Sequence, residues 1–229
     1  VVHASAFAGT KPRRQGEDRA FISKHGHPHP GEEWLNDRFW PDGMVRVTGR
    51  EYNGLLDTAC YQRGKMSCLS CHSMHSYLDN NDQLAPLMET NEACLQCHDD
   101  FRDNLTAHTH HATDSTGSLC YNCHMPHTTY GLLSGIRSHQ IDSPSVETQL
   151  KNGRPNACNL CHLDQTLLWT GRHLSKWYGH KQPQFNNDDK FVSSVLKMLL
   201  KGDAGQRAIA AWHMGWEPAR KVSGGNWQA

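Results

Sequence analysis

Residues 68–72 read Cys-Leu-Ser-Cys-His, and the same pattern, C-x-x-C-H, returns at 94–98, 120–124 and 158–162. Two thiols at this spacing reach the two vinyl groups on one edge of a porphyrin, and the histidine that follows reaches the iron through an imidazole nitrogen. Randomly placed residues of this composition would give on the order of 0.03 such matches. The four copies therefore predict four covalently attached haem c groups.

Each motif supplies two attachment cysteines and one proximal iron ligand, and no catalytic residue is predicted. The cysteines are Cys68, Cys71, Cys94, Cys97, Cys120, Cys123, Cys158 and Cys161, and the proximal histidines are His72, His98, His124 and His162. Zinc is the main alternative, but it needs two cysteine pairs per ion and no histidine after each pair. A thioredoxin-like redox pair would occur once, beside a βαβ pattern.

The remaining histidines are numerous enough to ligate every iron from its other side. The chain has 17 His, of which the motifs use four, so two imidazoles at most or all irons is the simplest prediction. The candidate distal ligands are His3, His75, His108, His111 and His139. Met66, Met74, Met88 and Met125 lie near the motifs and are an alternative, although packing explains them more simply. The pairing of ligands with irons stays open.

Composition agrees with an interior partly filled by cofactors. Hydrophobic residues make up 37% of the 229 residues and aromatic residues 8%, which is low for a chain that buries side chains alone. The 23 Lys and Arg balance 23 Asp and Glu, and no basic run indicates a nucleic-acid surface. The sequence contains no run of about 20 apolar residues, which is the length that a transmembrane helix needs. No transmembrane segment is therefore predicted. The expected partners are redox proteins or copies of the chain itself.

The motif spacing predicts a shared core. Successive motifs start 26, 26 and 38 residues apart, too close for each haem to have its own domain. We expect a mainly α fold with extensive loops and little or no β-sheet, a multihaem cytochrome c fold organised around four haems. The predicted parts are a mostly irregular N-terminal arm at 1–57, a tetrahaem core at 58–162 and a C-terminal helical segment at 163–229.

The C-terminal segment carries apolar residues at helical spacing. This pattern predicts helices at 163–178, 191–200 and 206–216, with Asn187, Asp188 and Asp189 at the start of the second and Gly202 at its end. The last two helices are typical of a helical-repeat pair, which needs a further surface to cover its apolar face. We therefore expect the pair to dock on the haem core or on another subunit.

The run GSLCYNCHMP at 117–126 lies between HTHH at 108–111 and RPNACNLCH at 154–162. Together these stretches resemble bacterial multihaem cytochromes related to the nitrifier tetrahaem electron carrier, over roughly residues 45–229. Some relatives carry helical repeats after the haems. The resemblance implies an exported electron carrier with mostly bis-histidine haems, and some members are parts of larger redox assemblies.

Three features depart from that family pattern or bear on export. Cys60 is a ninth cysteine outside the motifs. It is predicted to be buried, and in an exported protein a disulfide between chains or an unusual haem contact is the alternative. The sequence starts without Met and without a leader, which fits a secretory signal that has been removed. It stops at Ala229 in what reads as the middle of a repeat.

Three functions fit these features. The first is electron transfer in the periplasm or outside the cell, through haems whose irons are saturated by protein ligands. The second is reduction of nitrite, hydroxylamine or another small oxyanion, which needs one open iron and nearby acid and base groups. The third, compatible with either, is a subunit of a conducting filament, suggested by the close motifs, the reaching arm and Cys60. Abundant histidine favours the electron carrier over the enzyme.

Overall fold

The computed structural model describes residues 38–47, 50–76, 83–131 and 134–223. Within these ranges the chain forms mostly short helices joined by loops, and the sheet is a single pair of strands. This confirms the predicted mainly α fold with little β-sheet. Among the described helices, none combines the length and apolar character that crossing a membrane requires. His3 and most of the predicted arm lie outside the described residues.

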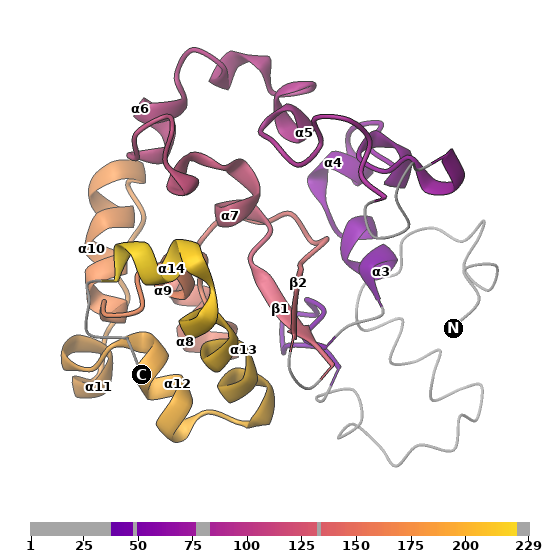
Figure 1. The fold of residues 1–229 in the computed structure, drawn as a ribbon. Coiled ribbons are helices and arrows are strands. Elements are labelled where there is room, and N and C mark those ends of the chain that lie inside the picture. Colours follow the sequence, from indigo (N-terminus) through magenta and orange to yellow (C-terminus); the bar gives the residue numbers. More distant parts are fainter. Residues whose placement is uncertain (1–37, 48–49, 77–82, 132–133, 224–229) are drawn as a thin grey trace, which may run out of the picture.

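The first half of the described chain carries three motifs on short helical turns. Its elements are α3 (Glu51–Leu56), α4 (Ala59–Gln62), the 3-10 helices η2 (Cys68–Ser70) and η3 (Met74–Ser76), α5 (Glu92–Leu95), η4 (Asp99–Phe101), α6 (Leu105–Thr109), η5 (Thr116–Ser118) and α7 (Cys120–His124). Figure 1 shows α3 and α4 on one side of the molecule, with the chain through α5, α6 and α7 arching over to the C-terminal helices.

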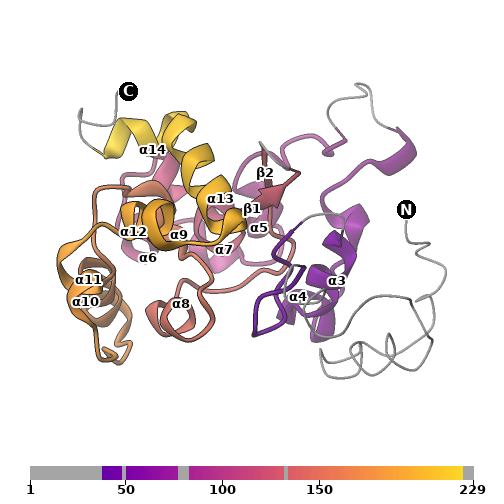
Figure 2. The same cartoon turned by 90° about the horizontal axis from the view of Figure 1, so that it is seen from below.

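A β-hairpin follows the third motif directly. It consists of β1 (His127–Tyr130) and β2 (Ser134–Arg137), antiparallel, with His127 opposite Arg137. Gly135 lets a helix approach closely, because a Cβ there would lie 3.1 Å from the Trp212 ring. In both views the hairpin lies between α3 and α13 (Figures 1 and 2). The hairpin therefore joins the two sides of the molecule.

The second half of the chain is helical and packs around the fourth motif. Its elements are α8 (Val146–Asn152), α9 (Ala157–Cys161), α10 (Leu167–Tyr178), α11 (Asn187–Phe191), α12 (Ser194–Lys201), α13 (Ala204–Gly215) and α14 (Glu217–Val222). Leu160 of α9 and the adjacent Leu163 share one buried cluster with Val195, Met198 and Ala210. The helices after the fourth motif thus dock on the helix that carries it.

The boundaries of these helices differ in part from the predicted ones. The helix expected at 191–200 starts at Ser194, because Val192 is extended (φ −109°, ψ 138°) and separates it from α11. The cause is a second capping residue: Ser193 accepts the N–H of Leu196 at 3.0 Å, whereas Asn186 caps α11. Gly202 ends α12 as predicted.

Candidate haem-binding site

Each C-x-x-C-H motif forms one helical turn. The N–H groups of His72, His98 and His162 donate to the carbonyl of the first cysteine of their own motif, at 2.9, 3.0 and 2.8 Å. Residues 120–124 form the same turn as α7. Positions i, i+3 and i+4 share one face of a helical turn. Both cysteines and the histidine of each motif therefore lie on a common face, as attachment to one porphyrin requires.

Polar side chains link the first three turns. Asn91, just before the second motif, donates to the carbonyl of Ser118 at 2.9 Å and accepts the N–H of Cys120 at 2.8 Å. Gln96, inside the second motif, donates to the carbonyl of Ser70 in the first motif at 3.0 Å. These contacts join segments up to 29 residues apart. The turns are therefore held as neighbours in chain order.

The attachment cysteines of successive motifs also lie together. The thiols of Cys94 and Cys120 share a hydrogen bond, which raises the pKa of Cys94 and lowers that of Cys120 to about 7. Burial raises the pKa of Cys123 to about 11, and the nearby Cys161 adds to this rise. The second motif is thus adjacent to the third, and the third to the fourth.

Three of the four proximal histidines each face a second histidine. The ring centres are 6.2 Å apart for His72 and His139, 6.1 Å for His124 and His108, and 6.1 Å for His162 and His111, with interplanar angles of 19°, 6° and 27°. A metal–imidazole bond is about 2 Å long, so one metal ion between two imidazoles holds their ring centres about 6 Å apart. The same separation at three independent places fits one iron between each pair.

Backbone carbonyls orient three of these rings. The Nδ1 atoms of His111, His124 and His139 lie 2.7, 3.0 and 3.1 Å from the carbonyl oxygens of Thr109, Asp142 and Arg137, respectively. A carbonyl only accepts, so each Nδ1 donates and each Nε2 keeps a lone pair for a metal. Burial lowers the pKa of His108, His139 and His162, which favours the neutral, metal-binding form.

Glycine makes room for one of the facing rings. A Cβ at Gly117 would lie 2.3 Å from the His111 ring, closer than any real Cβ contact. The main chain just before the third motif therefore lies directly against an imidazole that faces the fourth motif. A larger residue at position 117 would displace that ring.

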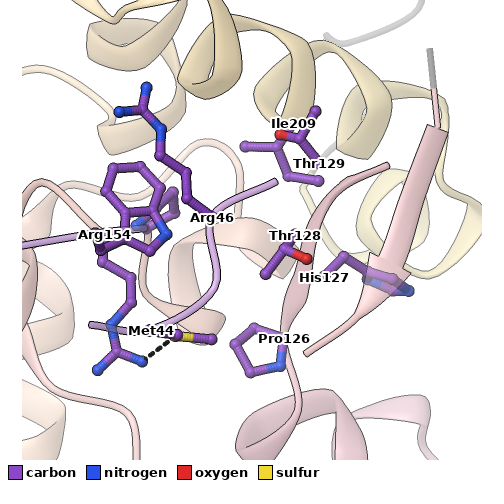
Figure 3. A pocket seen from close by; sticks show the side chains of 10 residues that line it. Met44, Arg46, Pro126, His127, Thr128, Thr129, Arg154 and Ile209 are labelled. Carbon is purple, nitrogen blue, oxygen red and sulfur yellow. Dashed lines mark hydrogen bonds between the residues drawn. The ribbon is translucent and has the colours of Figure 1, made fainter. Parts of the chain in front are cut away.

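A buried arginine supports the proximal histidine of the third motif. The N–H of Asp142 donates to the carbonyl of His124 at 3.0 Å, and the Asp142 carbonyl accepts from Nδ1 of that histidine at 3.0 Å. The Asp142 carboxylate pairs with Arg154 at 2.6 Å. Arg154, only 8% exposed, also contacts Asp42 at 3.1 Å and donates to Sδ of Met44 at 2.6 Å (Figure 3). The segment 38–47 is thereby connected to the third motif.

A second arginine lies between the third and fourth motifs. Arg137 donates to the carbonyl of Tyr121 at 3.3 Å and to the side-chain oxygen of Asn122 at 2.5 Å. Burial lowers its pKa to about 10, and the nearby Cys123 and Cys161 oppose that shift. Among the described residues, no carboxylate forms an ion pair with it. A partly buried positive charge therefore lies beside the attachment cysteines of two motifs.

The second motif differs from the other three. His98 is exposed, and its ring neighbour within the described ranges is Phe101, at 6.4 Å. His75 is also exposed, and no described ring contact joins it to a proximal histidine. Met88 is close to this motif, since its Sδ accepts from Gln96 at 3.7 Å. Of the five candidate distal histidines, the structure brings three opposite proximal histidines and leaves the partner of His98 open.

The ninth cysteine lies near the second motif. Cys60 is half-buried, and no disulfide joins it to another cysteine of the described residues. Cys60 contributes to the raised pKa of Cys94, although less than Cys120 does. The predicted disulfide between chains and the unusual haem contact both stay predictions.

Comparison with known proteins adds one finding. A family model described as a doubled CXXCH motif matches residues 61–103, which contain the first two motifs. The match indicates a multihaem c-type cytochrome. Such cytochromes bind haem covalently through these cysteines and are exported, so an extracytoplasmic location is consistent with the match. No curated protein and no solved structure matched the chain.

Sequence reasoning did not single out the residues that support these histidines. Arg137 stands two residues before His139, and Arg154 opens the run that contains the fourth motif. Their contacts reach back to Tyr121 and Met44. Proximity to a motif was the only sequence signal for either arginine, because their partners are set by the tertiary fold.

Proposed function

We propose that this chain is an electron carrier with four covalent haem c groups, at least three of them with two imidazole ligands. The eight motif cysteines would hold the groups, and the four histidines that follow them would be proximal ligands. The observation that carries the proposal is the near-constant separation of the three histidine pairs. Bound haem would supply one-electron chemistry, and the two histidines of each pair would hold the iron and keep substrates away from it.

The protein's own contacts support passage of electrons from one site to the next. His108 and His111 are three residues apart in sequence and face the proximal histidines of different motifs. The second and third motifs share the thiol contact between Cys94 and Cys120. Each proposed haem site is therefore adjacent to the next along the chain. Close neighbours favour transfer between sites over chemistry at one of them.

The finer assignments belong to the same proposal. We assign the carrier to the periplasm or the cell exterior, among relatives of the nitrifier tetrahaem electron carrier. Residues 58–162 would be the tetrahaem core, 1–57 an arm and 163–229 a helical-repeat-like segment. Support for the last part comes from α12, α13 and α14, which pack in succession over Leu160 and Leu163. Its partners would be redox proteins or further copies of the chain.

Two measurements on the purified protein test the proposal. Intact-mass analysis with a pyridine haemochrome assay is expected to give four haems per chain. Electron paramagnetic resonance of the oxidised protein is expected to show low-spin signals from at least three bis-imidazole haems. A bare or zinc-loaded polypeptide, or mostly high-spin or histidine–methionine haem, would contradict it.

A second function is favoured by the second motif. Because His98 is exposed and faces no described histidine, its iron is the candidate for an open position and for reduction of nitrite, hydroxylamine or a related oxyanion. High-spin haem amounting to one site, together with nitrite binding to it, would support this reductase. A fully low-spin wild type that becomes high-spin at one site in His75→Ala or Met88→Ala would identify an internal ligand instead.

The filament hypothesis concerns the same position. A ligand donated to the second motif by another copy would join copies head to tail into an open assembly. Electron microscopy at several protein concentrations tests this idea. Discrete particles at every concentration would remove it, whereas filaments whose dissociation frees one high-spin site would support it.

A further inference from the structure

One short segment supplies the facing imidazoles for two proximal histidines. His108 faces His124, and His111 faces His162. Between them His110 adopts the left-handed conformation (φ 58°, ψ 27°), which is unfavourable for a residue with a side chain. This turn redirects the main chain, so that two imidazoles three residues apart face separate partners.

The end of α10 holds this segment from outside. The Trp177 ring stacks on the His110 ring, with centres 4.4 Å apart and an interplanar angle of 15°. Tyr178 packs edge-on against His110 at 5.6 Å, and its hydroxyl donates to the carbonyl of His108 at 2.5 Å. The strained residue and the first facing histidine are therefore both held by residues about 70 positions later in the sequence.

Helix α10 is itself fixed at the fourth motif. Its residues Trp169, His173 and Trp177 follow at four-residue spacing on one face, with ring centres 4.2 and 4.8 Å apart. The first of these rings contacts His162 at 5.0 Å. Another side of the helix is buried through Leu167 and Leu174, in the cluster that also holds Phe185. One row of rings thus runs from a proximal histidine to the segment that carries its facing partner.

We infer that Trp177 and Tyr178 are positioning residues for the distal ligands of the third and fourth haems. The C-terminal helical segment would then control whether two irons keep their second imidazole. This inference rests on the proposed function, because it takes the two ring pairs as ligand pairs. It goes further in giving α10 a defined role in coordination at both sites together.

The test compares Trp177→Leu with Trp212→Leu in the full haem-loaded protein. Trp212 is a matched control, because it is also half-buried and packs on a histidine, His127, at 4.5 Å, away from the ligand segment. The readout is the fraction of ferrous haem that binds carbon monoxide, with low-spin resonance signals as a second measure. Trp177→Leu is expected to raise that fraction about three- to tenfold, because the loss of one aromatic contact changes an equilibrium by about this factor. The control should stay within about twofold.

Two further variants separate the contacts. Tyr178→Phe keeps the ring and removes only the hydrogen bond to His108, so a smaller rise of about two- to threefold is expected. His110→Gly tolerates the left-handed conformation and removes the ring. Because this variant and Trp177→Leu disrupt the same stack, their double variant should bind little more carbon monoxide than the stronger single variant.

The outcomes distinguish the inference from the proposed function. No change in Trp177→Leu and Tyr178→Phe, or equal changes in Trp177→Leu and Trp212→Leu, would overturn the inference while the wild type still shows bis-imidazole signals. Absence of those signals in the wild type would overturn the proposed function first, before any variant is measured.

Discussion

Arg137, which pairs with no carboxylate among the residues that the structure describes, brings a positive charge next to the attachment cysteines of the third and fourth motifs. We predict that Arg137→Gln lowers the reduction potential of the haems bound there by roughly 50 to 100 mV, because a nearby cation stabilises the added electron. Spectroelectrochemical titration measures the shift. Arg172→Gln, which removes an exposed arginine from α10, is the control. An unchanged or raised potential would show that the charge does not act on these haems.

Arg154 contacts Asp42, Met44 and Asp142 with one planar group. A lysine cannot reach three partners in the same way. We predict that Arg154→Lys lowers the free energy of unfolding by about 1 to 3 kcal/mol, because the buried positive charge loses part of its pairing. Urea unfolding measures this loss, and Arg172→Lys is expected to have almost no effect. Equal losses in the two variants would count against the described contacts.

For individual residues, the sequence predicted arrangements within a motif better than contacts between distant segments. The placement of each motif's two cysteines and its histidine on one face follows from a five-residue pattern, because the motif forms one helical turn. The facing residues do not, since His139 meets His72 only after the chain has passed through two further motifs. Sequence could propose a set of histidines but not their pairing. Arg137 and Arg154 act through partners that only the fold brings near.

The contact between β1 and α13 contains one buried and one half-buried histidine. His213 is 1% exposed, and its Nδ1 donates to the carbonyl of Ile209 at 2.8 Å. His127 packs edge-on against it at 5.2 Å, and the Arg137 charge disfavours protonation of both rings. Burial lowers the pKa of His213 to about 4 and that of His127 to about 2. The folded contact therefore favours the uncharged form of both rings.

The lowered pKa values of this histidine pair predict a loss of stability in acid. An unfolded histidine has a pKa of about 6.5, above the folded value, so the unfolded chain binds more protons as the pH falls below about 6.5. The stabilisation is complete above that pH and is lost toward pH 4. For His213 alone the loss between pH 7 and pH 5 is about 2 kcal/mol. Urea unfolding at both pH values measures this loss of unfolding free energy. The loss should be smaller in His213→Gln than in the wild type, and the control His180→Gln should lose as much as the wild type.

Helices were predicted from apolar spacing. This spacing indicates where helical structure occurs, but it does not show whether a stretch forms one helix or two. The segment around 187–201 has one apolar pattern but two N-terminal caps, at Asn186 and Ser193. Each cap satisfies N–H groups of its own helix, so the main chain between them turns out of helical conformation. The hairpin went unpredicted because its strands are four residues long and polar.

His139 connects distant parts of the molecule. It follows the hairpin in sequence, and its ring faces His72 of the first motif. We predict that His139→Gly converts one haem per chain from low-spin to high-spin, because one facing imidazole is lost. Added imidazole should restore the low-spin signal. Resonance measurements with and without imidazole check this result. Loss of more than one low-spin signal, or no rescue, would mean that the change acts on the fold and not on one ligand.

Gly117 also has a meaning for recognising other members of this protein's lineage. Since any side chain there would collide with the His111 ring, glycine three positions before the first cysteine of the third motif marks chains that bring a histidine to that place. Under the proposed ligation, a homologous sequence with a larger residue at this position would need another residue opposite the histidine of its fourth motif. The residue at this one position can therefore be read from an alignment to sort relatives whose haem motifs are otherwise alike.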